Sequence, residues 1–308
     1  MRIANILHKD QQKLSISAGD QPFIDFTAAL QAMEAATSGL AGRPIRSIQD
    51  LLDSGRFELS LFKEVLAFVA AHKLEGHVAL GRSDVQILAP FDRPGQIIAL
   101  ARNYTVHAQE STLPLPREPI FFSKSNTSVI GPGETIVLPP NLGRIEPEIE
   151  LAVVVRKKAS HVSAAVAEDY IAGYTILNDV SAQELQASEI KESYPLFRCK
   201  SLKTFTPMGP YLVTVDEVGL SPALNMTLRV NGELRVVANT SGLTFDVAQL
   251  LAFISGYLVL YPGDVITTGC PKAAGAIRPG DEVTLEIEKI GVLQNPVVVG
   301  FEACPVQV

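Results

Sequence analysis

The chain has 308 residues, of which 47% are hydrophobic and 19% charged, and its formal net charge is −7. This composition is ordinary for a globular protein with a sizeable core. The length suits one large domain, with or without a smaller one. No run rich in lysine and arginine occurs, which argues against nucleic acid or an anionic membrane as a partner.

The sequence also predicts the compartment. The longest apolar stretch, residues 65–71, is too short to cross a membrane, and residues 1–9 do not resemble a secretory signal. The three cysteines, Cys199, Cys270 and Cys304, lack metal-ligand spacing and suit a reducing environment. We therefore expect a cytoplasmic protein.

Residues 1–94 are predicted to form a small α+β domain. Two alternating runs, 2–6 and 13–17, indicate a hairpin around the polar stretch 8–12. Three helices are expected, each behind a side chain that can cap free N–H groups: Asp25, Ser47 and Ser60, the last helix ending near His72. Because no reactive side chains gather in this region, we interpret it as a packing or dimer-supporting domain.

Residues 95–308 are predicted to be rich in antiparallel strands. Asn231-Gly232 joins two alternating runs and is typical of a hairpin. An amphipathic helix is expected from Val247 to Leu258, capped by Asp246 or Thr244, and a helical turn is expected over 104–110. The expected strands are 96–101, 135–138, 148–155, 171–177, 211–215, 225–230, 233–237, 264–267 and 282–287. Strict strand–helix alternation is absent, which favours an α+β fold.

Two carboxylates open one of these strands. Glu148 and Glu150 are two residues apart, so both point to one face while Ile149 points to the other. Asp179 follows a second apolar strand and could reach the same edge. Three hard oxygen ligands suit Mg²⁺, or Mn²⁺ as a substitute, better than zinc. The alternative is a solvated strand end, where two such charges are also tolerated.

Other candidate residues carry less information alone. His107 and Glu110 stand three apart in the expected helical turn, so Glu110 could orient His107 as a general base. They could equally be surface residues. Thr268-Gly269-Cys270-Pro271 could direct backbone N–H groups at an anion or form a simple turn.

Several motifs in order closely resemble the fumarylacetoacetate hydrolase family over roughly residues 96–300. The motifs are Asn103-Tyr104-x-x-His107-x-x-Glu110, Glu148-x-Glu150-Leu-Ala, Asn178-Asp179-x-Ser181-Ala182, Lys200, Pro207-x-Gly209-Pro210 and Thr268-Gly269. The resemblance implies a mixed β-sandwich roll, a homodimer, and Mg²⁺ on Glu148, Glu150 and Asp179, with Mn²⁺ or Ca²⁺ as substitutes. It further implies catalytic roles for His107, Glu110 and Lys200, and substrate contacts from Gln183, Gln186, Thr268 and Gly269.

The chain departs from the family pattern where substrate would bind. Gln183 replaces an arginine and Glu184 an aspartate of one motif, Lys203 stands where an aspartate is common, and Cys270 replaces a threonine. The metal and base positions are kept. This pattern predicts an active enzyme with an unusual substrate.

The resemblance implies a Mg²⁺-dependent hydrolase that cleaves a C–C bond in a small 1,3-dioxo or 2-oxo carboxylic acid, as in an acylpyruvate. His107 would activate water, and Lys200 would stabilise the oxyanion or enolate. The same groups could serve a decarboxylase, an isomerase or tautomerase, or a dehydratase. A non-catalytic metal-binding paralogue is the alternative outside enzymes.

Overall fold

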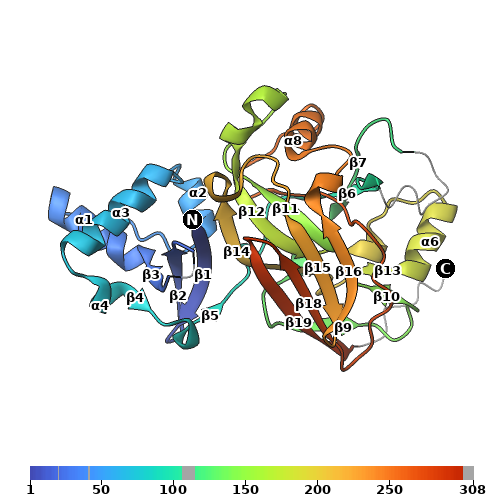
Figure 1. The fold of residues 1–308 in the computed structure, drawn as a ribbon. Helices are drawn as coiled ribbons and strands as arrows, with labels where there is room; N and C mark the ends of the chain where they lie inside the picture. The colour runs from blue at the N-terminus through green and yellow to red at the C-terminus, as the bar shows by residue number, and fades with distance from the viewer. Residues whose placement is uncertain (20, 41, 106–114, 301–308) are drawn as a thin grey trace.

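Two large β-sheets dominate the computed structural model, which describes residues 1–19, 21–40, 42–105 and 115–300 (Figure 1). One sheet has twelve strands, in the order β4-β3-β2-β1-β14-β12-β11-β17-β6-β7, with β5 beside β1 and β8 beside β14. The other has five, in the order β16-β15-β18-β19-β9, and a small third sheet pairs β10 with β13. Helices are few, so the chain is α+β and rich in strands, as predicted.

The N-terminal elements mostly agree with the prediction. The hairpin of β1 (Arg2–His8) and β2 (Gln11–Ser17) is confirmed. The first two helices, α1 (Phe26–Ser38) and α2 (Ile48–Asp53), begin behind Asp25 and Ser47, whose side chains accept backbone N–H bonds. The third, α3 (Leu59–Ala71), was placed wrongly at its start: it begins one residue before Ser60, and no side chain caps it.

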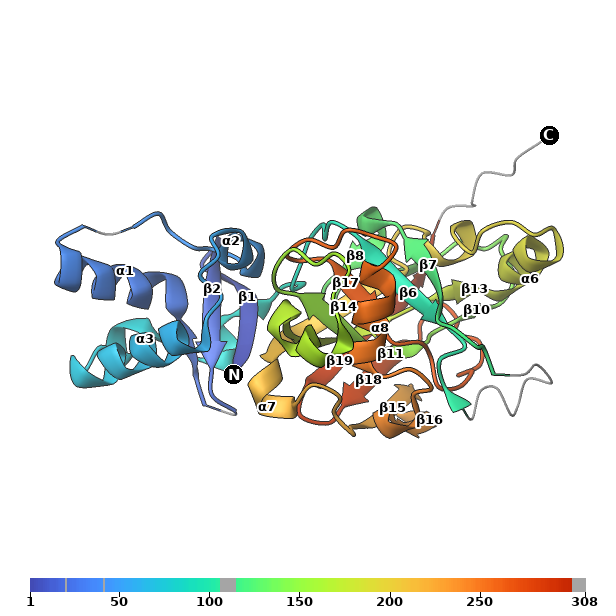
Figure 2. The same ribbon diagram turned by 90° about the horizontal axis from the view of Figure 1, so that it is seen from above.

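Strands from both sides of residue 94 pair in one sheet. Arg2 and Ile3 of β1 pair with Val213 and Leu212 of β14 (Thr206–Thr214). Helices α1 and α3 lie at the end of the molecule opposite α6 (Gln183–Lys191) in both views (Figures 1 and 2). The remaining N-terminal elements are β3 (Phe23–Asp25), α4 (Glu75–Val78), β4 (Ala79–Leu80) and β5 (Gln86–Ile87). The division into domains 1–94 and 95–308 stays a prediction.

Most strands predicted after residue 95 are present. They are β6 (Ile97–Ala101), β9 (Ile136–Leu138), β11 (Ile149–Val155), β12 (Ile171–Asn178), β15 (Asn225–Val230), β16 (Glu233–Asn239), β17 (Val265–Thr267) and β18 (Glu282–Ile287). The amphipathic helix α8 (Val247–Ser255) is capped by Asp246, which accepts from Gln249 N, and it ends before Leu258. Short elements complete the list: β8 (Val129–Ile130), β10 (Ile145–Glu146), β13 (Ser181–Ala182) and α7 (Val215–Val218).

Strand β14 was predicted too short, and several elements were not predicted at all. Strand β14 extends back to Thr206, although Pro207 and Pro210 in this segment resemble turn residues. The unpredicted elements include β7 (Ile120–Lys124), β19 (Gly291–Val299) and α6. Within the described residues, no helix combines the length and apolar character needed to cross a membrane.

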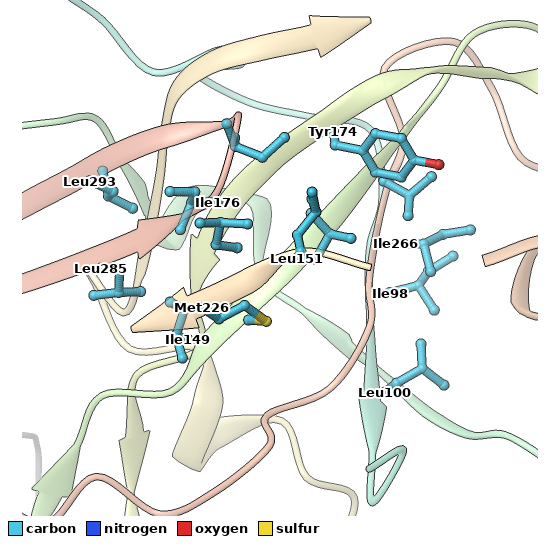
Figure 3. Close-up of a cluster of buried hydrophobic side chains, with 14 of the residues drawn as sticks. Ile98, Leu100, Ile149, Leu151, Tyr174, Ile176, Met226, Ile266, Leu285 and Leu293 are labelled. Atoms are coloured by element: carbon cyan, nitrogen blue, oxygen red, sulfur yellow. The ribbon is translucent and has the colours of Figure 1, made fainter. Parts of the chain in front are cut away.

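Strand β11 separates two hydrophobic cores because its side chains alternate. Ile149, Leu151 and Val153 face the five-stranded sheet, where they join residues such as Met226 and Leu285 (Figure 3). Ala152 and Val154 face the other way and belong to the core beneath the N-terminal helices. The face that carries Ala152 is also the face of Glu148 and Glu150, so the strand fixes where these carboxylates point.

Candidate metal centre

Strand register brings Asp179 to the two glutamates. Strands β11 and β12 are antiparallel, with Ile149 opposite Asn178. The N–H of Asp179 donates to the carbonyl of Glu148 at 2.9 Å, and the Asn178 side chain accepts from Glu148 N at 2.9 Å. The start of one strand therefore lies beside the end of the other, as the sequence predicted.

The three carboxylates form one cluster. Glu148, Glu150 and Asp179 each offer an oxygen, and these oxygens all lie within 4.8 Å of one another. Glu150 and Asp179 are buried, whereas Glu148 is half-buried. Glu146 does not join them: it lies on β10, and Arg144 Nε is 3.1 Å from its carboxylate.

Two buried lysines partly neutralise this cluster. Lys200 Nζ lies 2.8 Å from Glu148 Oε2 and 2.8 Å from Asp179 Oδ2. Lys124 Nζ lies 2.5 Å from Asp179 Oδ1 and also donates to the backbone carbonyl of Lys200. Sequence reasoning missed Lys124, because a lone lysine at a strand end carries no signal of burial.

Glu150 is the carboxylate that pairs with neither lysine. Its Oε2 accepts the N–H of Gly269 at 2.8 Å. Burial, followed by the negative charge of Asp179, raises the pKa of Glu150 to about 8. Gly269 has a φ of 91°, and a Cβ there would lie 3.2 Å from the Cβ of Asn103, so only glycine brings this N–H to the carboxylate without strain.

The charges of the other groups follow from their contacts. Burial opposes ionisation of Asp179, but the ammonium groups of Lys124 and Lys200 outweigh it and lower the pKa of Asp179. Burial lowers the pKa of Lys124. Burial also acts to lower the pKa of Lys200, yet Asp179 and Glu148 overcome this and raise it, so Lys200 is an ammonium at neutral pH.

A pocket of about 160 Å³ opens beside the cluster. Helix α6 contributes Gln183 and Gln186 to its wall, and Glu148, Lys200 and Cys270 also line it. Thr268 and Gly269 do not line this pocket, and the Thr268 hydroxyl donates to the Leu151 carbonyl at 3.0 Å. Another pocket, of about 380 Å³ near Asn5 and Pro90, contains none of the predicted site residues.

The donor set fits a divalent cation. Three carboxylates face two lysines, so Glu150 has no ammonium partner once it is ionised, and oxygen-only ligands suit Mg²⁺ or Mn²⁺. A buried carboxylate without a counter-charge is costly, which a bound cation would relieve. His107 and Glu110 lie outside the described residues.

Comparison with known proteins identifies the family. The model of the fumarylacetoacetate hydrolase C-terminal domain matches residues 96–298. The chain is 38% identical over 260 residues to human mitochondrial oxaloacetate tautomerase FAHD2A, covering 82% of this chain and 80% of that protein.

Solved structures share the fold over nearly the whole chain. The 5-carboxymethyl-2-hydroxymuconate delta-isomerase from Mycobacterium smegmatis has a TM-score of 0.72 at 31% identity and covers 98% of this chain and 100% of its own. Maleylpyruvate hydrolase from Sphingobium, solved with manganese(II) and pyruvate, has a TM-score of 0.75 at 28% identity, covering 97% and 100%. With a match over two thirds of its length and this shared fold, the chain is an enzyme of the fumarylacetoacetate hydrolase family.

Proposed function

We propose that the chain uses one divalent cation, held by Glu148, Glu150 and Asp179, to act on a small 2-oxo or 1,3-dioxo acid. The observation that carries this proposal is the carboxylate cluster with Lys200 at the wall of a pocket. A relative crystallised with manganese(II) and pyruvate supports both the metal and the class of substrate. The pocket is small compared with the roughly 300–1,000 Å³ of drug-sized sites, which suits a short acid.

Mg²⁺ is the cation we propose, with Mn²⁺ or Ca²⁺ as substitutes, because the ligands are all carboxylates. When bound, it would supply Lewis-acid polarisation of the 2-oxo group. Lys200 would donate a hydrogen bond to the oxygen on which negative charge develops. His107, oriented by Glu110, would move the proton, and Gln183 and Gln186 would contact the far end of the substrate.

The reaction we propose first is hydrolysis of a C–C bond, with His107 as the base that activates water. Tautomerisation is the second candidate, favoured because the human relative carries that activity in its name. Both need an enolate-like charge next to the carboxylate cluster, where Lys200 lies. They differ in whether water attacks a second carbonyl.

The test is a panel of 2-oxo and 1,3-dioxo acids with Mg²⁺ and with Mn²⁺. Chromatography detects cleavage products, and the ultraviolet absorbance of the enol form follows tautomerisation. Glu148→Ala should abolish either activity, whereas Lys63→Met, which changes an exposed side chain on α3, should not. Metal-independent turnover, or turnover retained in Glu148→Ala, would contradict the proposal.

A further inference from the structure

Lys200 lies where a metal ion would be expected to act. Its ammonium bridges two of the three candidate ligands, at 2.8 Å from each, and its side chain is only 5% exposed. A bridging cation between two carboxylates cancels their mutual repulsion, which is also what a bound metal does. The chain thus supplies part of the metal's electrostatic role itself.

The ligand oxygens are already engaged. Both oxygens of Asp179 accept from lysines, one from Lys124 and the other from Lys200. Glu148 Oε1 accepts from the Ser181 hydroxyl at 2.9 Å, and its Oε2 accepts from Lys200. A divalent cation that binds here must share these oxygens with Lys200 or take them from it.

The two lysines differ in their freedom to move. Lys124 Nζ is fully enclosed and also donates to the carbonyls of Lys200 and of Phe205, so three acceptors hold it. Lys200 Nζ donates to two carboxylates and lies 5.7 Å from the centre of the Phe122 ring, and its side chain lines the pocket together with Phe122. Lys200 can therefore swing toward the pocket, whereas Lys124 cannot.

We propose that Lys200 is a built-in counter-cation that competes with the metal for Glu148 and Asp179. Without metal it holds the two carboxylates together; when metal binds, it leaves them and presents its ammonium to the pocket. Two cations within a few ångströms repel, so Lys200 weakens metal binding while it keeps the empty site folded. This inference rests on the proposed function only in taking the carboxylate cluster as the metal site.

The test is calorimetric titration of Mn²⁺ into the full chain and into Lys200→Met, which shortens the side chain by one atom and removes its charge. The dissociation constant should fall at least tenfold in Lys200→Met. Lys203→Met is the matched control: it removes one positive charge three residues away from an exposed position, and its affinity should equal that of the wild type. Unchanged or weaker binding in Lys200→Met would overturn the inference.

Thermal unfolding gives a second readout. Metal-free Lys200→Met should melt at a lower temperature than the metal-free wild type. Mn²⁺ should raise the melting temperature of the variant by more than it raises that of the wild type. If the metal-free variant does not stay folded, the protein is purified with Mn²⁺ and titrated with a chelator, and the variant should need more chelator than the wild type. A wild type that binds no Mn²⁺ would overturn the metal site as well, whereas equal affinities would overturn the role of Lys200 alone.

Discussion

Metal affinity should depend strongly on pH because of Glu150. A ligand carboxylate must be ionised to bind a cation, yet burial and Asp179 raise the pKa of Glu150 to about 8 in the metal-free site. Binding below this pH must displace one proton from Glu150. The apparent affinity should therefore fall below pH 8, by up to about tenfold for each pH unit, or about fiftyfold between pH 8 and pH 6.

The same proton affects stability in the opposite direction. The usual pKa of a glutamate is 4.5, so between this value and about 8 the folded metal-free chain holds a proton that the unfolded chain has lost. The bound proton therefore stabilises the folded metal-free chain. This stabilisation is complete at low pH and is lost as the pH rises through about 8. The difference between the two pKa values corresponds to roughly 5 kcal/mol of folding free energy. Because the side chain of Glu150→Gln stays neutral, this variant should keep much of that stability above pH 8.

Two measurements check this reasoning. Mn²⁺ titrations at pH 6, 7 and 8, in buffers of different ionisation enthalpy, give both the affinity and the protons released. Glu150→Gln is the control: it should bind more weakly at every pH and lose most of the pH dependence in this range. A wild-type Mn²⁺ affinity that does not change between pH 6 and 8 would refute the raised pKa of Glu150. A metal-free Glu150→Gln chain that is no more stable to urea than the metal-free wild type at pH 9 would also refute it.

Three further predictions test the remaining roles. His107→Ala should lower turnover by about a hundredfold or more and leave Mn²⁺ affinity unchanged; loss of metal in this variant would contradict a role as base. Gln183→Arg should favour a dicarboxylic 2-oxo substrate over its monocarboxylic analogue by about tenfold, because arginine adds a charge-assisted contact. An unmoved ratio of kcat/KM would mean that Gln183 does not touch the substrate. The chain should be a homodimer, and light scattering that gives the monomer mass of 33.1 kDa at micromolar concentration would refute this.

Local spacing of apolar residues predicted the strands and helices that bury one face at a regular period. The strands around Asn231-Gly232 and the helix after Asp246 have alternating or helical apolar spacing, and the structure contains them. Helix α6 was missed because its residues are mostly exposed and polar, so the sequence shows no apolar stripe. Its one fully buried side chain, Glu189, is held by Arg198 and Cys199 from the segment that carries Lys200, a contact that no local pattern reveals.

The carboxylates of the site could be predicted because strand alternation and register are periodic. Lys200 was expected only through the family resemblance, and Lys124 was not predicted. Lys124 is buried beside residues far away in the sequence: Asp179 lies 2.5 Å from its Nζ, and the carbonyls of Lys200 and Phe205 accept from it. The strand patterns therefore predicted three carboxylates that bind one cation. The structure places two lysine side chains beside the three carboxylates, so the net charge of the cluster is about −1 when all five groups are ionised. A divalent cation would change this to about +1. An acidic chain could in this way attract an anionic acid to the site only after the metal has bound.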